Sequence, residues 1–510
     1  MYKAGVDGCS VRQKLITAFP NIIFKGVKLE ENTIMSIKAN LIFLTVSQSL
    51  NQLTSLLVFI ALSRTLSQAD YGTMREHVYI IEFAASILLF GLSDGLLALN
   101  KDPATNQKTI TNISYYIFIS TTIISLFFLL VFRYDFFNWQ KTNFMPFHLV
   151  LYAYSMMLFP LISSIAIIKK RIKAFIYFIL LTMFVKVITV LLALFHLVNN
   201  VNVYMLYTSL GVVSVIYYVI MERKAMLNFK DISLKHFVYT FKYTFPLGLS
   251  ILIKKSYTYL DKFVVSAFYN SKQLAIYANG SIPIPFVDFF NSSVNSVYLK
   301  HFADYHRDER QDLIYRDFFK VSNDLLFFYF GVTFGVFMFA SNLITFTFSS
   351  KYIASIIIFK ILLIRNIFKA FPTAIMFIVY DRRKLITLTS VLTIVINIIL
   401  IPGMKYLYGI NGLPYSIVIT EFIVIVWQLV VIGQIFKNKN YIKDIFVIVG
   451  KYILICLVAC GVVYVLQKMH IPVLLLMALW AFIYLFMTFA LGLMNFKEMK
   501  TKVMNYKFKK

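Results

Sequence analysis

Charged residues are scarce in this sequence. Of its 510 residues only 14% are charged, whereas 59% are hydrophobic and 17% are aromatic. In soluble domains about a quarter of the residues are charged. The composition therefore excludes an ordinary soluble protein and indicates helices that cross a membrane.

Cysteine is also rare, and the common motifs of cofactor chemistry are missing. The three cysteines are Cys9, Cys456 and Cys460, and the last two lie four residues apart in one apolar segment. A thiol in such a segment usually acts as a small hydrophobic side chain, so we expect no disulfide and no metal site. The sequence contains no GxxxxGK[ST], no HExxH and no paired CxxC. ATP hydrolysis and zinc chemistry therefore lack a basis, and we expect no cofactor and no enzymatic activity.

Long apolar segments are what the sequence has in abundance. Windows of about twenty residues predict fourteen membrane-spanning segments, which makes the fold class an all-α polytopic membrane protein. Met35 stands just before the first segment and is a candidate start of translation. The predicted segments are 38–63, 74–99, 109–132, 146–168, 174–197, 200–221, 243–268, 274–299, 322–347, 353–379, 385–402, 410–436, 444–466 and 471–494.

Basic residues lie mainly between these segments and on one side of the predicted membrane. The net charge of +27 comes from 50 Lys and Arg against 23 Asp and Glu. If the N-terminus is cytoplasmic, most of the positive residues fall in cytoplasmic segments, as the positive-inside rule requires. Topology and attraction to anionic lipid therefore explain the basicity, and nucleic acid is not an expected partner.

The order of the spans predicts two lobes related by a repeat. Spans one to six and seven to twelve are both even sets, so the two halves would insert in the same orientation. Tyr71 and Tyr277 each precede a small residue at the start of the second span of a half. The predicted parts are an N-terminal extension (1–37), a first lobe (38–221), a cytoplasmic linker (222–242), a second lobe (243–436), and two extra spans with a basic tail (437–510).

The seventh predicted span holds four charged residues, Lys254, Lys255, Asp261 and Lys262. A charge at the centre of a spanning helix costs roughly 2.5 to 3.5 kcal/mol, so each one needs a reason. On a helical wheel Lys254 and Asp261 fall on nearly one line, with Tyr257 and Thr258 between them. This line predicts a wall of a polar interior, and Lys262 lies off it.

Further charged and polar residues lie within other predicted spans. Lys186 is in span five, and Arg365 and Lys369 share a face of span ten. We interpret these positive residues, with Lys254 and Lys255, as the lining of a cavity that favours an anionic, phosphate-bearing ligand. Asp288 and Glu421 are candidate counter-ions.

Polar residues in the first two spans leave two interpretations open. Asn51 belongs to a polar stripe in span one, which faces either the cavity or a neighbouring helix. Glu82 in span two follows Arg75 by two turns, so the two form either a structural ion pair or part of a functional site.

Local patterns predict smaller features. Residues 300–321 mix charges with apolar side chains, as in a helix lying at the membrane interface. Pro283 and Pro285 predict a bend in span eight. The pairs Gly91/Gly95 and Gly331/Gly335 match a helix-contact spacing that chance alone would produce in so many spans.

Several segments resemble a known family. They are 61–72 (ALSRTLSQADYG), 90–99 (FGLSDGLLAL), 245–250 (FPLGLS) with 260–268 (LDKFVVSAF), and 397–421 (NIILIPGMKYLYGINGLPYSIVITE). These segments are similar to the polysaccharide-unit flippases, called Wzx-type, of the multidrug, oligosaccharidyl-lipid and polysaccharide (MOP) exporter superfamily. The resemblance covers about residues 36–436, and its motifs are diffuse.

The resemblance implies two six-helix lobes around a cationic cavity that opens alternately to each side. The substrate would be an oligosaccharide on a polyprenyl diphosphate, moved across the bacterial inner membrane for O-antigen, capsule or exopolysaccharide, with both termini cytoplasmic. Other membrane proteins of polysaccharide assembly would be partners. The acidic residue of the family's seventh span maps to Asp261. Family members often have Arg where this chain has Lys254 and Lys255, which puts a bidentate diphosphate clamp in doubt.

The residues that we expect to take part in transport follow from the pattern of charged and polar residues in the spans and from the family resemblance. Substrate-binding candidates are Lys254, Lys255, Asp261, Arg365, Lys369, Lys186, Asn51, Tyr257 and Thr258. Asp261 and Glu82 are candidates to bind a coupling proton or Na⁺. Two alternatives remain: a multidrug or cation antiporter of the same superfamily, which should have an acidic interior, and a membrane polysaccharide polymerase or ligase, which usually needs a large outside loop.

Overall fold

The fold is that of a helical membrane protein. A computed structural model describes residues 31–99, 103–133, 146–195, 200–436, 441–469 and 471–493, and over these ranges it contains helices and no strand. Each of the fourteen predicted spans coincides with a helix or with a broken pair or series of helices. The predicted all-α fold class is confirmed.

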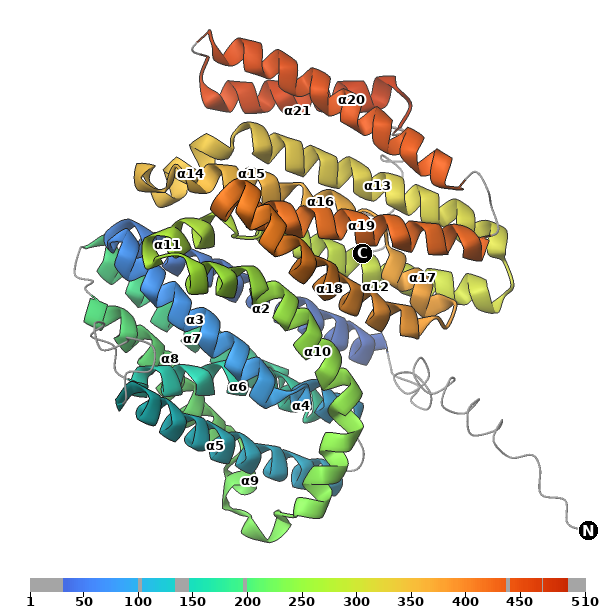
Figure 1. Ribbon diagram of the computed structural model, residues 1–510. Helices are drawn as coiled ribbons and strands as arrows, with labels where there is room; N and C mark the ends of the chain where they lie inside the picture. The colour runs from blue at the N-terminus through green and yellow to red at the C-terminus, as the bar shows by residue number, and fades with distance from the viewer. Residues whose placement is uncertain are drawn as a thin grey trace, which may run out of the picture.

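The helices of the first half run from α2 to α8 (Figure 1). They are α2 (Glu31–Thr65), α3 (Gln68–Leu89), α4 (Leu92–Ala98), α5 (Pro103–Arg133), α6 (Pro146–Ile168), α7 (Ile172–Leu194) and α8 (Asn200–Met221). The short α9 (Arg223–Leu227) and the 3-10 turn η2 (Phe229–Asp231) lead to the second half.

The second half begins with the long helix α10 and is followed by two added helices. Its elements are α10 (Leu234–Phe268), α11 (Ser271–Gly280), α12 (Pro285–Arg307), α13 (Gln311–Met338), α14 (Ala340–Phe348), η3 (Ser350–Tyr352), α15 (Ser355–Leu363), α16 (Arg365–Phe368), α17 (Thr373–Val379), α18 (Arg383–Tyr408), η4 (Gly409–Asn411) and α19 (Gly412–Phe436). The added pair is α20 (Tyr441–Gln467) and α21 (Val473–Ala490).

Membrane-crossing length and hydropathy are met by nine helical stretches among the described residues. One of them, Lys384–Phe436, contains both α18 and α19. The chain is therefore a multi-pass membrane protein. The helix α10 is absent from these stretches, and it carries the four charged residues of the seventh predicted span.

Four predicted spans are interrupted. Span nine is divided at Phe339, between α13 and α14, and the other three break at residues that disfavour a continuous helix. Span two breaks between α3 and α4, where Phe90 and Gly91 have positive φ of 38° and 71°. Span eight breaks between Gly280 and Pro285, at the two prolines expected to bend it. Span ten is divided into α15, α16 and α17, with Pro372 preceding α17.

Two sequence-based boundaries were wrong. Helix α10 begins at Leu234, so the second part of the expected linker 222–242 belongs to the helix. Residues 300–321 form no separate interfacial helix, since α12 continues to Arg307 and α13 begins at Gln311. Ile314 and Phe318 of that segment are fully buried in the second half, because they lie one turn apart on the face that packs inward.

The two halves share a hydrophobic core at the end predicted to face outside. Leu62, Leu66 and Tyr71 of the first half pack in one cluster with Phe348 and Tyr352 of the second. Lys351 Nζ donates to the carbonyl oxygens of Arg64 (3.0 Å) and Leu66 (2.8 Å), and Gln68 Nε2 donates to Lys351 O. In this conformation these contacts close the end that is predicted to face outside.

The paired tyrosines of the two halves lie close to this closed end. Both are fully buried, and Tyr71 OH donates to Asn279 Oδ1 at 2.9 Å, which joins α3 to α11. Close packing of these two helices requires Gly72, because a Cβ there would lie 1.7 Å from the carbonyl oxygen of Ser271.

The added helices pack on α13 at the edge of the second half (Figure 1). Gly331 and Gly335 lie beneath Tyr484 and Trp480 of α21. Tyr484 OH donates to the carbonyl oxygen of Phe327 at 2.7 Å. The glycine spacing that chance could produce is therefore a real helix contact here.

Candidate functional site

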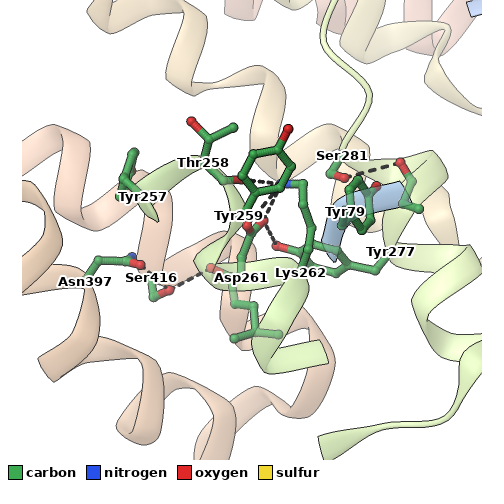
Figure 2. Close-up of polar contacts among 12 residues, drawn as sticks. Tyr79, Tyr257, Thr258, Tyr259, Asp261, Lys262, Tyr277, Ser281, Asn397 and Ser416 are labelled. Atoms are coloured by element: carbon green, nitrogen blue, oxygen red, sulfur yellow. Dashed lines mark hydrogen bonds and ion pairs between the residues drawn. The ribbon is translucent and has the colours of Figure 1, made fainter. Parts of the chain in front are cut away.

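The carboxylate of Asp261 is the centre of a buried polar cluster on α10. The residue is 3% exposed. Lys262 Nζ donates to both of its oxygens, at 3.0 and 3.1 Å, and Tyr277 OH of α11 donates to Oδ2 at 2.7 Å. Figure 2 shows Lys262 and Tyr277 turned toward this carboxylate. On the helical wheel Lys262 lay off the line through Lys254 and Asp261. In the structure its long side chain folds back, so that the ammonium contacts the carboxylate of Asp261.

One turn earlier on α10, a second cluster reaches across to α19. Tyr257 OH donates to Glu421 Oε1 at 3.1 Å, and Arg365 Nη2 of α16 donates to the same oxygen at 2.7 Å. Glu421 is thus the counter-ion of Arg365, as expected. The side chain of Asp288, the other candidate, lies outside the described residues. This pairing neutralises the deepest positive charge of span ten.

Polar side chains of α18 and α19 lie near the Asp261 cluster in Figure 2. Asn397 Nδ2 donates to Ser416 Oγ and to Thr420 Oγ1, both at 3.3 Å, and all three residues are buried. The side-chain oxygens of these residues are neutral, and the nearby carboxylate of Asp261 is acidic. A carboxylate binds a proton, and a carboxylate with neutral oxygens binds a hard cation.

The first half contains a separate cavity of about 230 Å³. Lys186 Nζ of α7 donates to Asn51 Oδ1 at 2.7 Å and to Ser55 Oγ at 2.8 Å, both on α2. The three residues line the cavity with Glu82 of α3 and Tyr152 of α6. Polar residues of span one therefore face a cavity, which favours the first of the two interpretations of that stripe.

Arg75 and Glu82 form no ion pair within 4.0 Å in the described part of the chain, so that interpretation was wrong. Arg75 donates to Tyr79 OH at 2.6 Å and stacks over the ring of Phe59, 4.0 Å from its centroid. Glu82 instead accepts from Tyr259 OH (2.7 Å) and Tyr152 OH (3.5 Å). The aromatic rings hold the guanidinium, and the phenols hold the carboxylate.

The remaining candidates of α10 stand apart from these clusters. Lys254 and Thr258 are exposed, and Thr258 Oγ1 donates to the carbonyl oxygen of Lys254 at 2.9 Å. Lys255 Nζ lies 5.8 Å from the ring centroid of Tyr259. Lys369 follows α16 and is partly buried.

The structure thus places six of the predicted site residues in three groups, and Lys254, Lys255, Thr258 and Lys369 lie in none of them. Asn51 and Lys186 share the cavity with Glu82, Tyr257 and Arg365 meet at Glu421, and Asp261 binds Lys262 and Tyr277. Sequence reasoning named Tyr257 but did not assign Tyr152, Tyr259 or Tyr277 to the site. Only Tyr277 carried a signal, as the repeated position in the second half, whereas Tyr152 and Tyr259 carried none.

Solved structures of other membrane proteins share this fold, among them the following two. The lipid II flippase MurJ, in an inward closed conformation, aligns over 88% of this chain and 98% of its own, with a TM-score of 0.65 and 16% identity. An inward-facing multidrug resistance MATE family transporter of the MOP superfamily aligns over 76% of this chain and 96% of its own, with a TM-score of 0.57 and 14% identity. The expected MOP-type fold is confirmed.

Sequence comparison gives the family. No curated protein matches the chain significantly. A family model described as polysaccharide biosynthesis protein matches residues 61–357, which is more than half of the chain. The chain therefore belongs to the polysaccharide biosynthesis protein family, built on the fold of the MOP transporters.

Proposed function

We propose that the protein is a flippase for oligosaccharide repeat units linked to polyprenyl diphosphate. It would carry them across the bacterial inner membrane by alternating access, for O-antigen, capsule or exopolysaccharide synthesis. Membership of the polysaccharide biosynthesis family and the MOP fold support this class of transport.

The observation that carries the proposal is the environment of Lys186. Its ammonium is hydrogen-bonded by neutral oxygens of Asn51 and Ser55 and has no carboxylate within 4.0 Å in the described ranges. The charge therefore stays uncompensated in a membrane-buried cavity, which favours an anionic ligand. Arg365, by contrast, is already neutralised by Glu421.

In this proposal, side chains of α10 would extend the binding surface, with Lys254 and Thr258 exposed and Lys255 and Tyr257 partly buried. Lys254 and Lys255 would hold the diphosphate, and Tyr257, Thr258 and Asn51 would contact sugar, with Lys369 and Arg365 contributing positive charge from the second half. Tyr and Asn suit sugar because they combine hydrogen bonding with flat or compact surfaces.

Coupling to an ion gradient would use Asp261, with Glu82 as the second candidate. Protonation of Asp261, or binding of Na⁺, competes with the ammonium of Lys262 for the carboxylate. Exchange of these partners would change the contact between α10 and α11 through Tyr277. Transport would be driven by the gradient, without covalent chemistry on the substrate.

The test is deletion of the gene followed by leaflet-resolved detection of lipid-linked oligosaccharide. The proposal requires the intermediate to accumulate in the cytoplasmic leaflet, and expression of the chain in trans should restore its transfer. Transfer at the normal rate in the deletion strain, with no substitute flippase present, would reject it.

A cation exporter is the second candidate, because Glu82 lines the same cavity as Lys186. Drug sensitivity of the deletion strain distinguishes the two. Increased sensitivity to lipophilic cations, with normal transfer of the oligosaccharide, would favour the exporter.

A further inference from the structure

A second cavity lies at the end of the first half that is predicted to be cytoplasmic. It has a volume of about 620 Å³ and is formed where α5 and α7 begin and where α6 and α8 end. Its lining includes Asn106, Gln107, Lys169, Arg171, Glu222 and Arg223. Arg171 is fifteen residues from Lys186 along α7, which corresponds to roughly 22 Å, so this cavity is separate from the one described above.

A buried ion pair forms one wall of the cavity. Lys169 Nζ donates to Glu222 Oε2 at 2.6 Å and to Gln107 Oε1 at 2.9 Å, and the Glu222 side chain is 1% exposed. The bond from Lys169 fixes the orientation of the Gln107 amide, because the atom that accepts must be oxygen. Gln107 therefore presents its N–H₂ group elsewhere.

Two polar atoms of this wall are left unsatisfied. Gln107 Nε2 and Glu222 Oε1 are buried and have no hydrogen-bond partner in the described part of the chain. A buried donor or acceptor without a partner costs about 1 to 3 kcal/mol. A ligand that supplies one acceptor and one donor would satisfy both.

Two exposed guanidinium groups determine the charge that the cavity favours. The charges of Lys169 and Glu222 neutralise each other in their ion pair. Arg171 and Arg223 are exposed and form no ion pair in the described ranges. Arg171 makes only a long contact, 3.5 Å, to the carbonyl oxygen of Met221. Guanidinium groups bind phosphate oxygens with two parallel hydrogen bonds, so the cavity favours a phosphate ester.

The apolar rim indicates that this ester belongs to a lipid. Ile168, Ile220 and Met221 also line the cavity, and Ile220 is 72% exposed. Positively charged pockets between membrane helices at the cytoplasmic surface bind the headgroups of anionic lipids.

We infer that this cavity binds the headgroup of an anionic phospholipid that bears a free hydroxyl, of the phosphatidylglycerol type. The phosphodiester accepts hydrogen bonds from Arg171, Arg223 and Gln107. A headgroup hydroxyl donates to Glu222 Oε1. This site is independent of the proposed transport of oligosaccharide.

Native mass spectrometry of the full chain in detergent tests the site. Phosphatidylglycerol is titrated against the protein, and then against the variant Arg171→Gln/Arg223→Gln. Loss of two cationic contacts should weaken lipid binding by at least about tenfold. The matched control is Lys170→Gln/Lys173→Gln, which removes two exposed charges at the same end but outside the lining.

Each outcome decides part of the inference. Equal weakening in both double variants would mean general charge attraction and would overturn the site. Phosphatidylethanol has the same diester anion without the hydroxyl, and binding as tight as that of phosphatidylglycerol would remove the role of Glu222. If soluble glycerol 3-phosphate displaces the lipid at equal concentration, the ligand is a soluble phosphate ester and the lipid assignment is wrong.

Discussion

Lys186 is a buried charge whose hydrogen-bond partners, Asn51 and Ser55, are neutral. If it binds the substrate anion, Lys186→Met should reduce transport roughly tenfold or more, since a hydrogen bond to a charged group contributes about 1.5 to 3 kcal/mol. The thermal midpoint of unfolding should stay the same or rise, because the variant no longer buries a charge. Lys173→Met, exposed at the start of the same helix, is the control for both measurements. Normal oligosaccharide transfer by Lys186→Met would remove this residue from the site.

Asp261 is held by Lys262 and Tyr277, so its structural and functional roles need separate tests. Asp261→Asn should abolish transport and lower stability by about 3 to 5 kcal/mol, because Lys262 is left buried without its partner. Asp261→Asn/Lys262→Met should recover stability and not transport. Unfolding midpoints and flipping by reconstituted protein measure the two effects. Transport by the double variant would show that the carboxylate only neutralises Lys262.

Lys254 is the exposed charge of the same helix. Lys254→Ala should lower transport strongly while leaving membrane insertion and the thermal midpoint unchanged, because the side chain is exposed and its ammonium forms no ion pair in the described ranges. Insertion is checked by protease accessibility of the loops. Transport equal to that of the unmodified chain would exclude Lys254 from the diphosphate-binding surface.

Single residues also show where sequence reasoning reaches its limit. Charge and polarity correctly marked Lys186, Asn51 and Asp261 as interior, because a charged or strongly polar side chain in an apolar span rarely faces lipid. The helical wheel placed Lys254 and Asp261 on one face, yet one is exposed and the other buried. A helical wheel shows in which direction each side chain leaves the helix axis. It does not show which neighbouring helix, if any, buries that side chain.

At the scale of elements, α10 packs closely on α3 and α4 at Gly248, opposite Gly91 and one turn from the contact at Gly95. A Cβ at Gly248 would lie 2.3 Å from the carbonyl oxygen of Phe90, which is backbone and cannot rotate away. Gly248→Ala should therefore destabilise the protein by about 1 to 3 kcal/mol or more. Thermal unfolding in detergent measures the effect.

Gly450 provides the matched control in α20. A Cβ at Gly450 meets nothing within 4 Å, so Gly450→Ala should be neutral or stabilising by about 0.4 to 1 kcal/mol. A similar loss of stability in both variants would contradict the tight contact at Gly248.

Helices were predicted well where hydropathy alone determines their position. Helix breaks and buried faces were predicted poorly, because they depend on contacts with neighbouring helices. Each of the fourteen predicted apolar runs coincides with a helix or a broken series of helices, and nine helical stretches of the described residues have the length and hydropathy of a membrane span. The division of span ten into α15, α16 and α17 was missed, because its sequence remains apolar through the interruptions. Ile314 and Phe318 were assigned to the interface, because the charges around them obscured the face that packs inward.

At the scale of the whole molecule, the two halves are joined at the end that is predicted to face outside. Gln68 contacts the backbone of Lys351 across the two halves. In a background with Cys9→Ser, Cys456→Ala and Cys460→Ala, crosslinking of Gln68→Cys to Lys351→Cys by a short bifunctional reagent should stop transport. A cleavable reagent restores it on reduction. Transport that continues with the crosslink in place would mean that this end need not open.

Helix α10 touches both halves over its length. It begins against α5, where His236 Nε2 and Thr109 Oγ1 are 2.9 Å apart, and ends beside α18, where Lys405 Nζ lies 3.2 Å from the ring centroid of Phe268. The halves therefore cannot turn independently, since any rotation between them must bend this single rod. Pro246 removes one backbone hydrogen bond next to the contact at Gly248, so the bending is concentrated there. In the proposed transport cycle the stiffness of this one helix would set part of the rate, so a sequence change at Pro246 would alter the speed of the cycle even though Pro246 is not among the proposed substrate-binding residues.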